Sequence, residues 1–392
     1  MIKSKTFQHF DPSRVPSPCF VVDEVAIEHN LKILDRVQKE SGAKILIALK
    51  AFSMFSLAPL ISHYLVGTCA SGLYEARLGH EEFGGEVHTF SAAYTEHDLS
   101  EILKIAHHVV FNSFSQWERF QPLIQAAKKQ RSELEFGLRI NPRHSEGAKA
   151  IYNPCSPGSR LGITLDEFLK HSTQELKGIS GLHFHTLCEQ SFEPLDRTLT
   201  AIEQQFGKWL PQMKWINFGG GHHISDDDYP VDALIERIKS FQKKYSVQVY
   251  LEPGEAIAIH SGILVSEVLD LTYNEMNIAI LDTSATCHMP DTLEMPYRAH
   301  IHGSGLLAEK PFGYRIGGQT CLAGDVMGDY SFDKPLHVGQ RLMFDDMAHY
   351  TMVKTSTFNG IPLPGLALWN SKKDTLRIVK TFDYHDFKNR LS

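Results

Sequence analysis

Residues 45–50 read Ile-Leu-Ile-Ala-Leu-Lys, an apolar run that ends in a lysine. A short aliphatic run of this kind is typical of a buried strand. Stretches with helical spacing separate it from later runs of the same kind, and they include residues 25–39, 73–83, 116–129 and 231–244. The later strand-like runs lie at residues 64–69, 87–91, 109–112, 134–140, 179–185, 215–218 and 247–251.

Strands that alternate with helices predict a parallel sheet, and the eight runs match the number that closes a TIM-like (β/α)₈ barrel. An open doubly wound sheet has the same alternation, so periodicity alone does not separate the two folds. After about residue 261, strand-like runs at 263–269, 278–281, 341–344 and 376–381 follow one another with few helical intervals. We therefore predict a barrel at residues 25–260 and a mainly β domain, a β-sandwich or a β-barrel, at residues 261–392.

Bulk composition narrows the class of protein. The chain has 392 residues, of which 42% are hydrophobic and 22% are charged, as expected for a globular enzyme with two domains. The net charge of -7, without a Lys/Arg-rich run, argues against nucleic acid as a partner and fits a cationic substrate. No apolar segment is long enough for a membrane span or a secretory signal. The six cysteines are scattered, which favours reduced thiols in the cytoplasm.

Lys50 lies where a barrel places its reactive groups, at the carboxyl end of a strand. We expect partial desolvation there to lower the pKa of the amine and to favour a Schiff base with an aldehyde. A solvated loop lysine is the alternative interpretation of the same position. Residues near Lys50 must therefore decide between these two interpretations.

Three further strand ends carry residues with matching chemistry. His185 ends the sixth predicted strand and can stack on a flat cofactor, whereas a lone histidine is more often an interior residue. Gly220 and Gly221 follow the seventh strand, where backbone without side chains can approach a phosphate. Glu252 ends the eighth strand, and a carboxylate there can pair with a pyridinium nitrogen.

This order of amine, imidazole, glycine triplet and carboxylate resembles the fold-type III pyridoxal phosphate (PLP) enzymes, which include ornithine, arginine and diaminopimelate decarboxylases. The resemblance covers nearly the whole chain. It implies PLP as the cofactor and Lys50 as its Schiff-base residue. It also implies that residues 1–24, with the strand Pro18–Asp23, pack with the β domain.

The resemblance assigns roles to residues in the second domain. Cys321, in Cys-Leu-Ala-Gly-Asp, matches the family's catalytic loop, and either Cys321 or Lys50 delivers the final proton to the product. Tyr350 matches the tyrosine that contacts the cofactor phosphate. Because the family's cysteine loop comes from the neighbouring subunit, the resemblance also implies a homodimer with shared active sites.

Within this family, the chain resembles the carboxynorspermidine/carboxyspermidine decarboxylases most. The likeness lies in residues 48–53, 185–189 and 284–291 and in the continuation 293–298. Glu255 stands where ornithine and diaminopimelate decarboxylases have an arginine. An acid there can meet a positive charge on the substrate, and Asp291 and Asp325 are expected to add further negative charge.

Three alternatives remain beside this interpretation. Another basic amino-acid decarboxylase of the same fold, acting on diaminopimelate or ornithine, is the nearest. A metal-dependent barrel hydrolase would use His183, His185 and the pair His222-His223, although we expect no metal site. A relative without activity would lack the lysine or the cysteine, and both are present. The sequence leaves the chain length of the substrate open.

Overall fold

The computed structural model describes residues 6–147, 150–171 and 176–392. The chain folds into two compact units. The barrel unit is Glu28–Ile257, and the sheet unit combines Met1–Ile27 with Ala258–Ser392. Each unit has a sheet of its own.

Among the described residues of the barrel unit, eight parallel strands follow one another in the order β5-β4-β3-β2-β10-β9-β8-β6. Pairing of β5 with β6 closes the ring, which confirms the predicted barrel over the open sheet. A short ninth strand, β7 (Ile163–Thr164), pairs with the end of β6. The barrel strands are β2 (Lys44–Ala48), β3 (Gly67–Ala70), β4 (Glu86–Phe90), β5 (His108–Phe111), β6 (Glu135–Asn141), β8 (Gly181–His183), β9 (Trp215–Asn217) and β10 (Gln248–Leu251).

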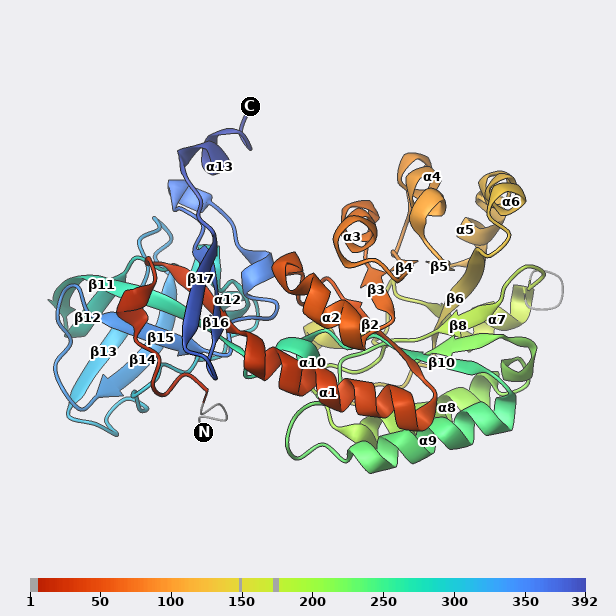
Figure 1. The fold of residues 1–392 in the computed structure, drawn as a ribbon, viewed down its shortest axis with the longest axis horizontal. Helices are drawn as coiled ribbons and strands as arrows, with labels where there is room; N and C mark the ends of the chain where they lie inside the picture. The colour runs from red at the N-terminus through yellow and green to blue at the C-terminus, as the bar shows by residue number, and fades with distance from the viewer. Residues whose placement is uncertain (1–5, 148–149, 172–175) are drawn as a thin grey trace. The chain divides into compact units, whose positions relative to one another are not determined.

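Helices connect these strands and lie outside the ring (Figure 1). The single helix predicted at residues 116–129 is wrong, because the chain breaks at Phe120 into two helices. Pro122 at the start of the second helix lacks an amide hydrogen, so an uninterrupted helix is unfavourable there. The helices are α1 (Glu24–Ser41), α2 (Ala58–Tyr64), α3 (Leu73–Leu78), α4 (Glu96–Ile105), α5 (Phe114–Arg119), α6 (Gln121–Gln130), α7 (Leu165–His171), α8 (Phe192–Phe206), α9 (Val231–Tyr245) and α10 (Glu255–Ala258).

Trp215 of β9 fills the middle of the barrel. It is buried in a cluster with Leu46, Val110 and Tyr250, which come from three other strands. A Cβ atom on Gly181 would stand 2.1 Å from the indole Cδ2 atom, so the glycine in β8 leaves the space that the tryptophan occupies. This apolar layer separates the two ends of the barrel interior.

The sheet unit confirms the predicted mainly β domain and its use of the N-terminal strand. Strand β1 pairs antiparallel with β11 and parallel with β16. The long strand β11 also pairs with β15 and, through its second half, with β12. The strands are β1 (Cys19–Asp23), β11 (Gly262–Asn274), β12 (Met276–Leu281), β13 (Phe312–Gly317), β14 (Val326–Phe332), β15 (Arg341–Asp345), β16 (Gly365–Asn370) and β17 (Thr375–Lys380), and the short helices are α11 (Ala285–His288), α12 (Asp291–Glu294) and α13 (Tyr384–Lys388).

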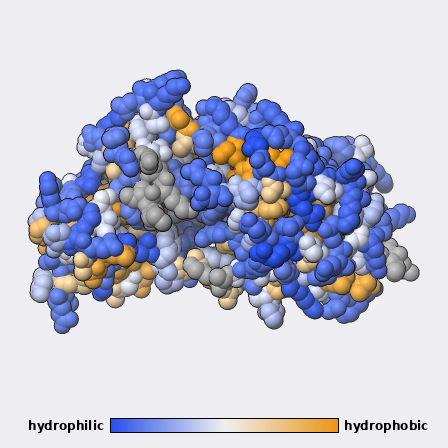
Figure 2. Space-filling view, turned by 90° about the horizontal axis from the view of Figure 1, so that it is seen from below, coloured by the Kyte–Doolittle hydropathy of each residue, from blue (hydrophilic) through white to orange (hydrophobic). Residues whose placement is uncertain are grey.

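Surface chemistry is mostly polar on the face shown in Figure 2, where hydrophobic residues form small separate areas. Scattered apolar residues of this kind are normal for a globular protein. None of the helices within the described residues has both the length and the apolar character that crossing a membrane requires.

Candidate active site

Four neighbouring strands of the barrel bring the predicted residues together. Strands β2, β10, β9 and β8 are consecutive in the ring, and Lys50, Glu252, Gly220 and His185 follow their carboxyl ends in that order. Parallel strands end at the same rim of a barrel. Residues that are up to about 200 positions apart in the chain therefore gather at one rim.

Lys50 comes two residues after the last residue of β2, Ala48, and its side chain is exposed. The expected partial desolvation of the amine stays a prediction. Its charge nevertheless acts on the interior, because Lys50 contributes to the lowered pKa of His185 after the larger effect of burial. The amine is accessible to a ligand that enters at this rim.

His185 is fixed by contacts on both sides. Its Nδ1 atom accepts a hydrogen bond of 2.9 Å from the amide of Gly220, and its carbonyl oxygen accepts one of 3.1 Å from Arg139. Burial holds the pKa of His185 well below its usual range, and the positive charges of Lys50 and Arg139 add to the effect. The imidazole is therefore neutral, with its proton on Nε2 and a flat uncharged ring at the rim.

Gly220 is required by close packing of the backbone. A Cβ atom at this position would stand 2.0 Å from the carbonyl oxygen of Glu252. Its amide donates to His185, so this N–H group is already engaged. Phosphate binding by Gly220 and Gly221 stays a prediction, and for Gly220 it requires the bond to His185 to open.

Glu252 carries an ionised carboxylate inside the rim, where its side chain is 13% exposed. Its Oε1 atom accepts a hydrogen bond of 2.7 Å from Asn217, and its Oε2 atom lies 3.2 Å from Nε2 of His183. Burial alone would raise the pKa of Glu252, but the contacts with His183 and Asn217 outweigh it and hold the pKa below its ordinary value. Such a carboxylate can keep a proton on the nitrogen of an aromatic ring.

Sequence reasoning missed two residues of this site and misread a third. Arg139 in β6 and Asn217 in β9 are buried polar side chains within apolar runs, and this mismatch with the pattern was the available signal. The guanidinium of Arg139 lies 4.5 Å from the ring centre of Phe90, and burial lowers its pKa to about 10. His183 was read only as half of a His-x-His pair, yet it is the partner of Glu252.

Glu255 begins α10, close behind the rim, and its side chain is 17% exposed. Its Oε2 atom lies 3.3 Å from Nε2 of His223, in the loop after β9. The acid that replaces the family's arginine therefore has a histidine neighbour. The sequence reasoning missed this pair because the two residues are 32 positions apart.

Within the sheet unit, Asp325 is buried and organises the loop that carries Cys321. Its carboxylate accepts hydrogen bonds from the hydroxyl groups of Ser284 and Thr320, at 3.0 Å and 2.8 Å, and from the amides of Thr286 and Thr320. The thiol of Cys321 is exposed beyond this network. Direct contact of Asp325 with a substrate would require these hydrogen bonds to open.

Asp291 and Tyr350 are connected through Lys354 in the same unit. The ammonium of Lys354 lies 2.5 Å from the Asp291 carboxylate, and its amide donates to the carbonyl oxygen of Tyr350 at 3.0 Å. Tyr350 has a φ of 47°, which is uncommon for a residue with a side chain. The structure thus gives Asp291 a cationic partner within the chain.

The histidines of the hydrolase alternative do not form a metal cluster within the described residues. His183 contacts Glu252, His185 accepts from Gly220, and the Nδ1 atom of His222 lies 2.6 Å from the hydroxyl of Tyr229. In the part of the chain that the structure describes, the group with metal-ligand geometry is Glu86, His88 and His108, at the opposite end of the barrel strands.

Comparison with known proteins agrees with this arrangement. The family model described as pyridoxal-dependent decarboxylase, C-terminal sheet domain, matches residues 19–348. The chain is 44% identical to the carboxynorspermidine/carboxyspermidine decarboxylase of Campylobacter jejuni subsp. jejuni, over 96% of this chain and 99% of that protein. It is 42% identical to the carboxyaminopropylagmatine decarboxylase of Synechocystis sp., over 97% of this chain and 96% of that protein.

A solved structure is also similar along the chain. The crystal structure of carboxynorspermidine decarboxylase from Campylobacter jejuni, in complex with norspermidine, superposes with a TM-score of 0.87 at 42% sequence identity. The match covers 96% of this chain and 100% of that one. Barrel and sheet thus recur together in a protein that binds a polyamine.

Proposed function

Because the chain belongs to the family of pyridoxal-dependent decarboxylases, we propose that it removes carbon dioxide from carboxynorspermidine, carboxyspermidine or both, and releases norspermidine or spermidine. The enzyme is a PLP-dependent carboxy-lyase. The observation that carries the choice of substrate is the identity, over almost the whole chain, to a relative that bears this name.

Residues at the barrel rim fit the cofactor. An accessible amine, a neutral imidazole and an ionised carboxylate lie on adjacent strand ends, and these groups suit an aldehyde, a flat ring and a protonated ring nitrogen. When bound, PLP supplies an electron-accepting ring that stabilises the charge left on Cα by the departing carboxylate. The residues that would hold it are Lys50, His185 and Glu252, with Gly220, Gly221 and Tyr350 toward its phosphate.

The chain's own groups have separate tasks in this proposal. Lys50 would hold the cofactor through its amine, which is accessible at the rim. Glu252 keeps a proton on the ring nitrogen, since His183 and Asn217 keep its carboxylate ionised. His185 packs its uncharged ring against the cofactor. Cys321 or Lys50 returns a proton to Cα.

In this proposal, acidic side chains bind the positively charged groups of the substrate. A polyamine carries several ammonium groups, and each gains from a carboxylate partner. Glu255 is the candidate within the barrel unit, with His223 as its neighbour. Asp291 and Asp325 are the candidates from the sheet unit, where Asp291 would exchange its contact with Lys354 for one with the substrate.

Carboxyaminopropylagmatine is a second candidate substrate, because a relative of that name is 42% identical over nearly the full chain. It differs from the carboxylated polyamines in a terminal guanidinium, which a carboxylate binds with two parallel hydrogen bonds. Diaminopimelate and ornithine are less well supported. Each carries one ammonium group fewer than a carboxylated polyamine for the acidic side chains to bind.

We propose that the enzyme lies in the cytoplasm. We also propose that it forms a dimer. The proposal of a homodimer with shared active sites rests on the family resemblance of the Cys321 loop. Sedimentation of the PLP-loaded enzyme tests it, and a monomer with full activity would contradict it.

Mass spectrometry of reaction products tests the substrate. Purified enzyme with PLP is offered carboxyspermidine, carboxynorspermidine, carboxyaminopropylagmatine, diaminopimelate and ornithine in separate reactions. We expect kcat/KM to be highest for one of the two carboxylated polyamines. A higher value for carboxyaminopropylagmatine would select the second candidate, and a higher value for either amino acid would refute the polyamine assignment.

A further inference from the structure

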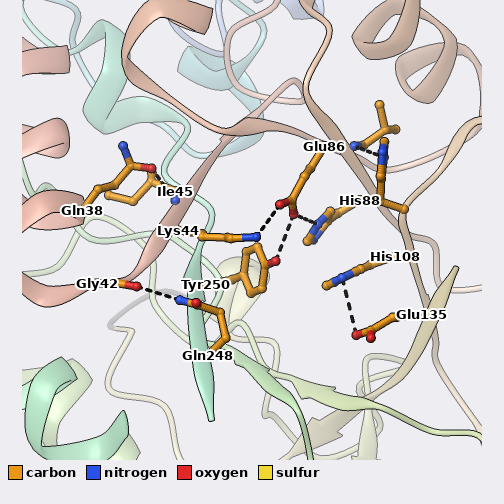
Figure 3. Close-up of polar contacts among 12 residues, drawn as sticks. Gln38, Gly42, Lys44, Ile45, Glu86, His88, His108, Glu135, Gln248 and Tyr250 are labelled. Atoms are coloured by element: carbon orange, nitrogen blue, oxygen red, sulfur yellow. Dashed lines mark hydrogen bonds and ion pairs between the residues drawn. The ribbon is translucent and has the colours of Figure 1, made fainter. Parts of the chain in front are cut away.

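At the end of the barrel opposite the active site, charged and imidazole side chains fill the interior. Lys44, Glu86, His108 and Glu135 are the first residues of β2, β4, β5 and β6. Side chains two positions apart in a strand point to the same side, so His88 faces inward together with Glu86. Figure 3 shows Lys44, His88 and Tyr250 converging on the Glu86 carboxylate.

Each of the two carboxylates uses one oxygen for a lysine. Glu86 Oε1 lies 2.6 Å from the ammonium of Lys44, and Glu135 Oε1 lies 2.7 Å from that of Lys214. The second oxygen of each turns toward a histidine. Glu86 Oε2 lies 2.9 Å from His88 Nε2, whereas Glu135 Oε2 is 3.8 Å from His108 Nε2, too far for a hydrogen bond.

The buried ring of His108 has a nitrogen atom without a hydrogen-bond partner in the part of the chain that the structure describes. Its side chain is 9% exposed and lies between the rings of His88 and Trp215, with centroid distances of 3.9 Å and 4.6 Å. Its Nδ1 atom is buried and has no hydrogen-bond partner among the described residues. A buried polar atom without a partner is costly, and a neutral imidazole with a lone pair is a common metal ligand.

The geometry points to a divalent transition-metal site, and we propose that Glu86, His88 and His108 bind Zn²⁺ at this end of the barrel. Their ligand atoms lie within 4.8 Å of one another. A tetrahedral zinc ion holds such atoms about 2.0–2.1 Å from itself and thus about 3.3 Å apart, so binding would bring the ligand atoms closer together and reorient the stacked rings of His88 and His108. Glu135, whose Oε2 atom lies 3.8 Å from His108 Nε2, offers a further carboxylate oxygen for the fourth position.

The surroundings suit a structural ion. Tyr250 donates a hydrogen bond of 2.9 Å to Glu86 Oε2, and Lys44 holds the other oxygen of Glu86, so the carboxylate is oriented by outer contacts. The two lysines compete with the ion for negative charge, so we expect binding in the micromolar range. Lys44 begins β2 and Lys50 follows its carboxyl end, so the proposed ion lies at the opposite strand end from the Schiff-base residue and has a structural role.

Zinc titration of the PLP-loaded enzyme, first treated with a chelator, tests the proposal by calorimetry. We expect one Zn²⁺ per chain, no comparable binding of Mg²⁺, and at least tenfold weaker Zn²⁺ binding in His88→Gln and in His108→Gln. His29→Gln changes an exposed histidine of α1 and serves as the matched control. His223→Gln tests for competing binding at the active-site rim.

Crystals soaked in zinc chloride decide the location even if the variants fail to fold. An anomalous difference peak among Glu86, His88 and His108 is the expected result. Absence of stoichiometric binding by the wild-type enzyme, a peak only near His222 and His223, or unchanged affinity in a folded His88→Gln variant would overturn the proposal. None of these outcomes depends on which substrate the enzyme decarboxylates.

Discussion

Each end of the barrel interior has a glutamate next to a histidine, but the other partners of the two glutamates differ. At the carboxyl ends of the strands, Glu252 lies 3.2 Å from His183, and at the amino ends Glu86 lies 2.9 Å from His88. Glu252 has a neutral amide, that of Asn217, as its other partner, whereas Glu86 has the ammonium of Lys44. Glu252 therefore contacts an imidazole and an amide, whereas part of the charge of Glu86 is balanced by the ammonium of Lys44.

The segments around the two glutamates also differ. Loops follow the carboxyl ends, and they supply an exposed lysine and a glycine triplet beside Glu252. At the amino ends, the ring of His108 stacks between those of His88 and Trp215. The comparison teaches that a histidine–carboxylate pair does not identify an active site by itself. Its other partners and its access to ligand decide the chemistry.

Among the substitutions that test this difference between the two ends, the replacement of Lys50 is expected to have the largest effect on activity. Lys50→Ala should lower kcat/KM by at least about 10³-fold, because the amine proposed to hold the cofactor is lost. Reduction with borohydride followed by mass spectrometry should show no PLP adduct. Lys44→Met, at the other end of β2, should retain the adduct, and a Lys50→Ala enzyme that kept both adduct and turnover would refute the assignment.

Glu252→Gln should lower kcat by about 100-fold, or about 2.7 kcal/mol in the activation barrier. A neutral amide cannot hold a proton on the ring nitrogen, although it can still contact Asn217. Steady-state kinetics with saturating PLP measure the effect. If Glu252→Gln and Glu86→Gln reduced kcat equally, the proposed division of roles between the two ends would be wrong.

Gly181→Ala should destabilise the layer between the two ends by about 1–3 kcal/mol, because the new methyl group would overlap the indole of Trp215. The midpoint of thermal unfolding measures this change. In a Trp215→Phe background the same substitution should cost less, since the smaller ring leaves room. Equal costs in both backgrounds would show that the contact does not limit packing.

Glu255→Gln should raise KM for the polyamine about tenfold, which corresponds to about 1.4 kcal/mol, through loss of one charge-assisted contact. The affinity for PLP, measured by cofactor release on dilution, should stay within about twofold. An unchanged KM would remove Glu255 from the substrate site.

The smallest expected effect is on the pH dependence of the stability of the fold. Burial lowers the pKa of His108, so the folded protein does not take up the proton that the unfolded chain binds below about pH 6.5. Stability should therefore fall as the pH is lowered from about 6.5, by up to about 1.4 kcal/mol per pH unit for this group. His108→Gln should make the decline between pH 6.5 and 5.5 shallower, and an unchanged slope would contradict a neutral buried ring.

Much of this arrangement could be predicted from the sequence. Apolar runs separated by helical spacing predicted the barrel, and the strand ends predicted the gathering of Lys50, His185 and Glu252 at one rim. Local patterns determine these features, since a parallel strand must bury both faces. The break at Phe120 was also encoded, in Pro122, but helical spacing on either side concealed it.

Other features arise only from distant contacts. The pairing of Glu252 with His183, the burial of Arg139 and the enclosure of Asp325 join residues from separate segments. Lys50 lies in the turn at residues 49–51, which directly follows β2.

The sequence by itself determined the order of strands, the position of Lys50 after a strand end and the family, because these depend on local periodicity and on contiguous motifs. Only the tertiary structure decided that Glu252 contacts Asn217 and that Glu86 contacts Lys44. The physical reason is that the charge available at Glu252 or Glu86 depends on its partners in space, and strands far apart in the chain supply those partners.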